Sequence, residues 1–200
     1  MQKSDRKPLY FLALGDSYTI GEAVADEERW PVQLAKLLQQ KGFDVQPPEI
    51  IATTGWRTDQ LKEAIMKGTQ RNEYDMVSLL IGVNNQYQGR PVESYRPEFE
   101  ELLRVAIQLA GGKKERVFVL SIPDYGFTPF GREKQQAISA GIDAYNAANK
   151  EISDNYGVQY FYITDLTRKG LEDSTLVAPD GLHPSGKMYA LWAERIAAVF

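Results

Sequence analysis

Short apolar segments alternate with longer amphipathic segments along the chain. The apolar segments are Leu9–Leu14, Ile50–Thr53, Asp75–Ile81, Arg116–Ile122 and Gln159–Ile163. Each is too short for a helix and is followed by turn-forming residues, so these segments predict five buried strands.

The segments between them repeat their apolar residues with helical spacing. The clearest stripe runs from Phe99 to Ala110, and the glycine pair Gly111-Gly112 predicts the end of that helix. Pro31, directly after Trp30, predicts the first turn of another helix, where the missing proline N–H costs no hydrogen bond. Two further stripes are Ile138, Ile142, Tyr145 and Ile152, and Tyr189, Trp192, Ile196 and Val199.

Strands that alternate with helices imply right-handed crossovers, which make the strands parallel and cover both faces of the sheet. The pattern therefore predicts an α/β fold of three layers, α/β/α, around a doubly wound five-stranded parallel sheet of the flavodoxin-like type. A chain of 200 residues fits one hydrophobic core, so residues 1–200 are predicted to form a single domain.

The composition is that of a folded protein and argues against several functional classes. Hydrophobic residues make up 43% and charged residues 25%, close to the average for globular chains. A net charge of −4 without a basic stripe argues against a nucleic-acid partner. With no cysteine and one histidine, neither a metal site nor another cofactor is expected.

The N-terminal segment, Met1–Pro8, is polar and charged and lacks the apolar core of a signal peptide. No apolar run approaches the roughly 18 residues of a membrane helix. These features favour a cytoplasmic protein without a membrane span, and they leave open a form exported after removal of a signal. The oligomeric state is not predicted by the sequence.

Four unusual segments follow predicted strands or precede the last helix. They are Gly15-Asp16-Ser17, Thr54-Gly55, Gly82-Val83-Asn84-Asn85 and Asp180-Gly181-Leu182-His183. In open α/β sheets, ligands bind at the carboxyl ends of the strands, where these segments are expected to meet. Taken singly, each is as well explained by a helix cap, a turn or a bend. Their common position favours a catalytic site.

The residue types suit acyl transfer. A serine hydroxyl needs a neighbouring base, and His183 is the only histidine in the chain. Asp180, three residues earlier, is within reach of the ring and would fix its tautomer. The N–H groups of Ser17 and Gly55 and the side-chain amide of Asn84 would stabilise the oxyanion.

These blocks resemble the SGNH (GDSL-type) hydrolase family, named for a serine, glycine, asparagine and histidine in four separated blocks. The matching blocks are Leu12–Thr19, Gly55, Gly82–Asn85 and Asp180–Pro184. The resemblance implies a three-layer α/β/α fold with Ser17, Asp180 and His183 as catalytic triad. It likewise implies an oxyanion hole formed by Ser17, Gly55 and Asn84.

Two positions depart from the family pattern. Tyr18 stands where the family often has leucine, which is expected to alter local packing or the pocket wall. Asn85 stands where an aspartate usually follows the asparagine. Because Asn84 itself is intact, we expect the second change to affect support of the loop rather than the chemistry.

The predicted function is hydrolysis of small-molecule carboxylic esters through an acyl-enzyme on Ser17. Acyl transfer to an alcohol and a catalytically silent lipid- or carbohydrate-binding module are the alternatives. The ordinary α/β-hydrolase fold is disfavoured because no Gly-x-Ser-x-Gly motif is present, and a nucleotide-binding function because no Gly-x-Gly-x-x-Gly or P-loop follows the first strand.

The substrate is less sharply defined than the reaction. The resemblance points to lysophospholipids, short-chain acyl esters, thioesters or acetylated carbohydrates. Aromatic residues on the loops near the site are candidates for an apolar acyl groove, although core packing explains each equally well. They are Trp56, Tyr87, Tyr125, Phe127 and, as a further candidate, Phe130.

Overall fold

Five parallel strands form the centre of the molecule. The computed structural model describes residues 7–200, so most of the N-terminal segment considered above lies outside the described residues. The strands are β1 (Phe11–Gly15), β2 (Glu49–Ala52), β3 (Met76–Leu80), β4 (Val117–Leu120) and β5 (Gln159–Phe161). They pair in the order β2-β1-β3-β4-β5, and every pair is parallel. The predicted five-stranded doubly wound sheet is therefore confirmed.

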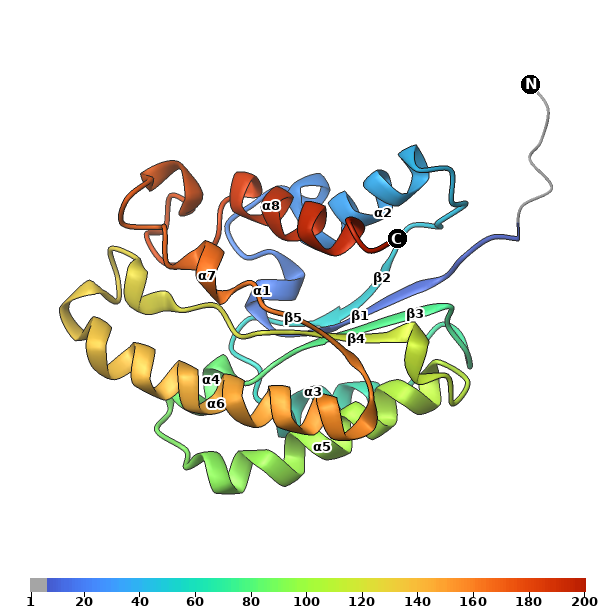
Figure 1. Cartoon of the computed structure of the whole chain (residues 1–200), viewed down its shortest axis with the longest axis horizontal. Helices are drawn as coiled ribbons and strands as arrows, with labels where there is room; N and C mark the ends of the chain where they lie inside the picture. Colours follow the sequence, from blue (N-terminus) through green and yellow to red (C-terminus); the bar gives the residue numbers. More distant parts are fainter. Residues whose placement is uncertain (1–6) are drawn as a thin grey trace.

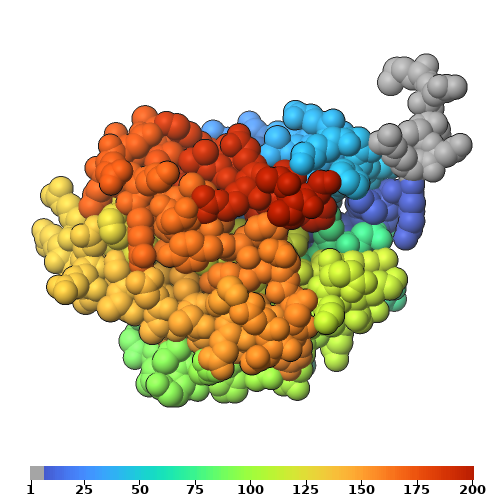
Figure 2. All heavy atoms as spheres, in the orientation of Figure 1, coloured from blue at the N-terminus to red at the C-terminus, as the bar shows by residue number. Residues whose placement is uncertain are grey.

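Helices cover both faces of this sheet (Figure 1). Helices α2 (Trp30–Gln40) and α8 (Gly186–Ala197) lie on one face. Helices α3 (Thr58–Met66), α5 (Val92–Leu109) and α6 (Gln135–Tyr156) lie on the other. The space-filling view shows α8, in red, packed beside α2, in light blue (Figure 2). The three-layer prediction is confirmed.

The central strands are buried on both sides. Leu12 and Leu14 in β1, Leu79 in β3 and Val119 in β4 are completely inaccessible to solvent. Strands covered by helices on both faces need apolar residues at successive positions, which explains the unbroken apolar runs in the sequence. Trp30, at the start of α2, packs on Phe11 of β1 with the ring centroids 6.1 Å apart.

Three short helices and five 3-10 turns within residues 7–200 were not predicted. The helices α1 (Ser17–Ile20), α4 (Val83–Tyr87) and α7 (Thr164–Thr167) each follow a strand within a few residues. The 3-10 turns are Asp26–Glu28, Lys114–Arg116, Tyr125–Phe127, Arg132–Lys134 and Ser174–Leu176. Elements of three to five residues are too short to show an apolar period, and several of them carry the candidate site.

The predicted helix boundaries vary in accuracy. Helix α2 begins at Trp30 as expected, and α5 ends at Leu109, just before Gly111 and Gly112 adopt positive φ angles of 69° and 76°. Helix α5 starts earlier than its clear apolar stripe and contains Pro97. Across the part of the chain that the structure describes, no helix combines the length and apolar character needed to cross a membrane.

Candidate active site

Ser17 is the first residue of α1 and lies two residues after the end of β1, an interior strand of the sheet. The turn between them is tight: a Cβ on Gly15 would lie 2.6 Å from the Leu80 carbonyl oxygen of the neighbouring strand, so only glycine fits. Asp16 caps the short helix, its Oδ1 accepting from the N–H of Tyr18 at 3.0 Å. The N–H of Ser17, as the first in the helix, has no intrahelical acceptor and is available to a ligand.

The histidine lies in a turn before α8. Asp180 Oδ1 accepts from the N–H groups of Leu182 and His183, at 2.9 and 3.0 Å, so the carboxylate is fixed by its own turn. Its other oxygen, Oδ2, lies 2.6 Å from Nδ1 of the His183 ring. This contact assigns the ring proton to Nδ1 and leaves Nε2 to accept a proton.

Electrostatics around this pair favour the ionised carboxylate. Burial opposes ionisation of Asp180, but hydrogen bonds from the His183 ring and from the N–H groups of Leu182 and His183 outweigh it and lower the pKa of this carboxyl. Asp180 is therefore an anion at neutral pH and can stabilise an imidazolium at His183.

Tyr18 packs edge-on against the His183 ring, with centroids 5.8 Å apart. Burial raises the pKa of Tyr18 well above its ordinary value, so the side chain stays a neutral phenol. Tyr18, which departs from the family pattern, was expected to alter local packing. In the structure it contacts the candidate base, His183, directly.

Gly55 and Asn84 contribute the candidate oxyanion donors. Gly55 has a positive φ of 85°, which favours glycine, and within residues 7–200 its N–H donates to no backbone carbonyl. Asn84, in the first turn of α4, donates one amide hydrogen to the Trp56 carbonyl at 2.9 Å. The second amide hydrogen is left for a ligand.

Ser17, Gly55, Asn84 and His183 all line one open cavity of about 310 Å³. Asp180 lies behind the histidine ring, outside the lining. The four segments singled out from the sequence thus meet at one edge of the sheet, as their positions after the strands predict. Among the described residues, no three acidic or histidine side chains gather as a metal-binding group.

Three aromatic rings form one wall of this cavity. Tyr87, Tyr125 and Phe130 come from α4 and from the segment after β4, and their centroids are 6.0 to 6.5 Å apart. Tyr87 is 60% and Phe130 55% exposed, whereas Tyr125 is buried beneath them. The Tyr125 hydroxyl donates to Gln86 Oε1 at 3.0 Å, which fixes the buried ring. We call these three rings the aromatic wall.

Two of the predicted substrate contacts, Trp56 and Phe127, are not part of this cavity's lining. Trp56 packs on the hydrophobic core and presents only its backbone to Asn84. Phe127 lies beside the Arg168 guanidinium, whose carbon is 6.0 Å from the ring centroid. Phe127 and Tyr125 share one 3-10 turn, but only Tyr125 lines the cavity, a distinction that the sequence does not contain. Phe130, the further candidate from the sequence, completes the lining instead.

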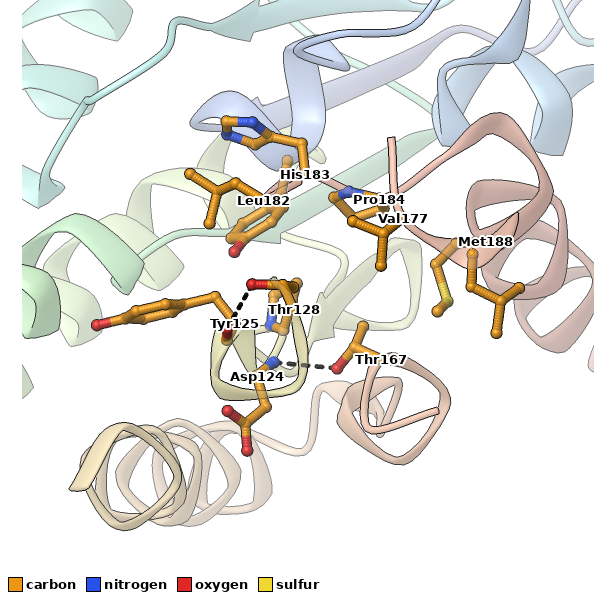
Figure 3. A pocket seen from close by; sticks show the side chains of 12 residues that line it. Asp124, Tyr125, Thr128, Thr167, Val177, Leu182, His183, Pro184 and Met188 are labelled. Atoms are coloured by element: carbon orange, nitrogen blue, oxygen red, sulfur yellow. Dashed lines mark hydrogen bonds between the residues drawn. The ribbon is translucent and has the colours of Figure 1, made fainter. Parts of the chain in front are cut away.

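A second cavity lies behind the histidine (Figure 3). It has a volume of about 20 Å³ and is bordered by His183, Leu182, Thr128 and Met188. This space holds about one water molecule, so it is too small for any part of an ester larger than that. The larger cavity in front of Ser17 is therefore the candidate substrate site.

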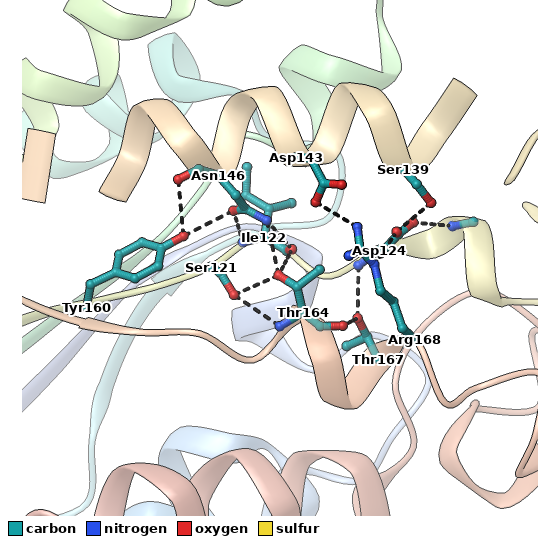
Figure 4. A network of polar contacts seen from close by, with 11 residues as sticks. Ser121, Ile122, Asp124, Ser139, Asp143, Asn146, Tyr160, Thr164, Thr167 and Arg168 are labelled. Carbon is teal, nitrogen blue, oxygen red and sulfur yellow. Dashed lines mark hydrogen bonds and ion pairs between the residues drawn. The ribbon is translucent and has the colours of Figure 1, made fainter. Parts of the chain in front are cut away.

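A polar network holds the segment that carries Tyr125 (Figure 4). The carboxylate of Asp124 is fully buried and accepts from Arg168 Nε at 2.9 Å and from the Ser139 hydroxyl at 2.7 Å. The Asp124 N–H donates to Thr167 Oγ1 at 3.0 Å. One end of the aromatic wall is thus tied to α6 and α7. The N–H of Phe130 donates to the Gly181 carbonyl at 3.0 Å, which ties the other end to the histidine turn.

Asp16, beside the candidate nucleophile, has an unusual environment. Its side chain is buried, and in the described chain Oδ2 has no hydrogen-bond partner. Burial raises the pKa of Asp16 to about 7, although the hydrogen bond from the Tyr18 N–H opposes the shift. Nothing in the sequence pattern indicates that this carboxyl titrates near neutral pH.

The fold and the residues at its strand ends define an SGNH-hydrolase-like α/β protein. The chain belongs to the GDSL-like lipase/acylhydrolase family, which it matches over residues 13–191. The family prediction is confirmed. No curated protein matches the chain.

Several solved structures are similar to the chain. TesA has a TM-score of 0.72 at 15% identity, with 94% of this chain and 95% of that chain covered. The psychrotrophic esterase EstA from Pseudoalteromonas sp., inhibited by monoethylphosphonate, has a TM-score of 0.66 at 17% identity, with 94% of each chain covered. The acetylxylan esterase Axe2 from Geobacillus stearothermophilus has a TM-score of 0.71 at 18% identity, covering 95% of this chain and 93% of that chain. At these identities the likeness establishes the shared fold.

Proposed function

We propose that this protein hydrolyses carboxylic esters through an acyl-enzyme on Ser17. The observation that carries the proposal is the 2.6 Å contact between His183 Nδ1 and Asp180 Oδ2 beside a cavity lined by Ser17, Gly55 and Asn84. A nucleophile, an oriented base and oxyanion donors around one space are the parts that acyl transfer needs. Membership of a lipase/acylhydrolase family supports the same reaction.

In the first half-reaction, Ser17 Oγ attacks the ester carbonyl while His183 Nε2 takes the hydroxyl proton. The carbonyl oxygen becomes an anion held by the N–H groups of Ser17 and Gly55 and by the free amide hydrogen of Asn84. When the intermediate collapses, His183 returns its proton to the leaving alcohol, and the acyl group stays on Ser17.

The second half-reaction repeats these steps with water. His183 Nε2 removes a proton from the water, the hydroxide attacks the acyl carbonyl, and the proton passes to Ser17 Oγ as the acid leaves. Asp180 stays ionised throughout and compensates the charge on the imidazolium.

The direct test compares wild type with Ser17→Ala on p-nitrophenyl acetate. The expected loss in kcat/KM is about 10⁴-fold or more, at unchanged thermal stability. A fluorophosphonate probe should label wild type at Ser17 and leave Ser17→Ala unlabelled. Equal turnover by the two proteins would overturn the proposal, and a folded wild type that resists the probe would favour a silent binding module. Ester products formed with added acceptor alcohols would indicate a transferase.

For the substrate, we propose an ester with an apolar acyl group of modest length that lies against the aromatic wall. Two exposed rings at the mouth of the cavity offer apolar surface that a bound chain would remove from water. Each added methylene buried there is worth about 0.8 kcal/mol, or roughly a fourfold rise in kcat/KM.

Chain-length series of p-nitrophenyl esters test this assignment. Wild type should gain activity with each methylene until the wall is covered, and Phe130→Ala and Tyr87→Ala should flatten the rise while leaving acetate turnover nearly unchanged. Tyr162→Ala is the matched control, because Tyr162 is 44% exposed but lies outside this cavity. Preference for acetylated sugars over all longer acyl esters would instead indicate that the rings stack on carbohydrate, the substrate class named for Axe2.

A further inference from the structure

Asn85 is completely buried and uses both ends of its amide. Its Oδ1 accepts from the N–H of Thr58 at 3.2 Å, and its Nδ2 donates to the Thr58 hydroxyl oxygen at 2.7 Å. The same Nδ2 lies 3.4 Å from Glu98 Oε2 of α5. The amide therefore joins three elements: α4, the start of α3 and α5.

Thr58 connects this amide to the candidate oxyanion hole. It is the first residue of α3 and follows the segment Gly55-Trp56-Arg57 directly. Asn84 holds the middle of that segment through the Trp56 carbonyl, and Asn85 holds its end through Thr58. Two consecutive amides thus fix the position of Gly55 relative to Asn84.

The charge that an aspartate would supply at position 85 comes from Glu98. The Thr58 hydroxyl donates to Glu98 Oε2, and Glu98 Oε1 pairs with Arg90 Nη1 at 3.4 Å. The other cation nearby, Arg57, is already paired with Asp59 at 2.8 Å. A carboxylate at position 85 would face the Glu98 carboxylate, and Arg90 and Arg57 are each already paired with another carboxylate. It would also lose the two hydrogen bonds that the amide donates.

We propose that Asn85 and Glu98 form a positioning pair that sets the geometry of the oxyanion hole, with asparagine at position 85 because α5 supplies the carboxylate. The inference rests on the proposed ester hydrolysis. It predicts that the protein tolerates one carboxylate, at either position 85 or position 98, but not a carboxylate at both. With an aspartate at position 85 and a glutamine at position 98, the glutamine amide can donate to the aspartate carboxylate. Thr58 then still has hydrogen-bond partners at both positions.

The test is a double-mutant cycle with Asn85→Asp, Glu98→Gln and the combined variant, on p-nitrophenyl acetate, with kcat normalised to sites titrated by the fluorophosphonate probe. Asn85→Asp should lower kcat about tenfold or more with KM within about twofold, because a misplaced oxyanion donor affects the transition state. Glu98→Gln should cost about threefold or less. The combined variant should recover to within about threefold of wild type.

Glu101→Gln is the matched control. Glu101 also joins α5 to α3, through Lys62 at 2.6 Å, but it makes no contact with Asn85 in the described chain. Its kcat should equal that of wild type. If Asn85→Asp does not fold, Thr58→Val provides the test, since it removes the bridging hydroxyl without burying a charge; a kcat reduced about threefold or more is expected.

Full kcat in Asn85→Asp, no recovery in the combined variant, or full kcat in Thr58→Val would overturn the positioning pair. Ser17→Ala, assayed in parallel, distinguishes a failure of the proposed function from a failure of the positioning pair. If Ser17→Ala matches wild type, the proposed function is wrong and the positioning role falls with it. If Ser17→Ala is inactive and the cycle shows no rescue, only the positioning pair is wrong.

Discussion

Asp16 gives the sharpest prediction of stability against pH. The change is Asp16→Asn, which keeps the side-chain oxygen that accepts from the Tyr18 N–H and therefore keeps the cap of α1. It removes the titrating carboxyl, whose pKa burial raises to about 7 from an ordinary 3.8. The variant thus isolates the ionisation of one buried group beside Ser17.

Wild type loses stability as the pH rises, because the folded state binds the Asp16 proton more tightly than the unfolded state does. Below pH 3.8 the carboxyl is neutral in both the folded and unfolded states, and its favourable contribution is complete. As the pH rises towards 7, the unfolded chain releases the proton while the folded protein keeps it, so wild type loses about 1.4 kcal/mol per pH unit from this group. Over the whole window the loss is about 4 kcal/mol. The amide that replaces the carboxyl does not titrate, so Asp16→Asn escapes this loss.

Urea unfolding of both proteins between pH 4 and 8 measures the effect. The other carboxyls titrate in both proteins and cancel in the difference, which should grow by about 4 kcal/mol in favour of the variant and level off above pH 7. A difference that stays within about 1 kcal/mol across this range would refute the raised pKa. Activity provides a second readout: any acid limb of kcat/KM that persists in Asp16→Asn does not arise from Asp16.

Three further changes probe the supports of the site. Tyr18→Leu removes the ring edge against His183 and should lower kcat about tenfold at similar KM, measured in steady state; an unchanged kcat would show that the contact is dispensable. Arg168→Met leaves the buried Asp124 carboxylate without its cation and should cost about 3 kcal/mol in urea unfolding, whereas a loss under about 1 kcal/mol would contradict this account. In Gly141→Ala the new Cβ would lie 2.6 Å from Gln86 Nε2 and should displace the partner of Tyr125. KM for longer acyl esters should then rise a few-fold while the melting temperature holds, and an unchanged KM would count against the wall.

Much of the candidate site was predictable because its residues lie next to strand ends and turns that the sequence itself indicates. Ser17, Gly55 and Asn84 lie two, three and four residues after the ends of β1, β2 and β3, and parallel strands bring their carboxyl ends to one edge. Asp180 and His183 are three residues apart in a turn that the aspartate itself stabilises. Each of these relationships spans a few residues or follows from the order of the strands, so the sequence contains it.

The supports of these residues were not predictable, because they join positions far apart in the chain. Glu98 reaches Asn85 across the space between α5 and α4, and the wall depends on Gln86, which lies against Gly141 of α6. Neither Gln86 nor Gly141 carries a motif. The position of Phe127 outside the cavity lining was not predictable either, since its neighbour Arg168 lies 41 residues further along the chain.

The turns that carry Ser17 and His183 and the aromatic wall are held by different parts of the fold. The candidate nucleophile and base are held by hydrogen bonds within their own turns, donated by the Tyr18 N–H to Asp16 and by the His183 ring to Asp180. The aromatic wall depends on α6 and α7 and on one backbone bond from Phe130 to the histidine turn. Substitutions in α6 can therefore reshape the wall through Gln86 and Gly141 without touching the turns that carry Ser17 and His183. If the protein cleaves esters as proposed, this arrangement predicts that changes in the aromatic wall alter KM for long acyl chains before they alter kcat for acetate.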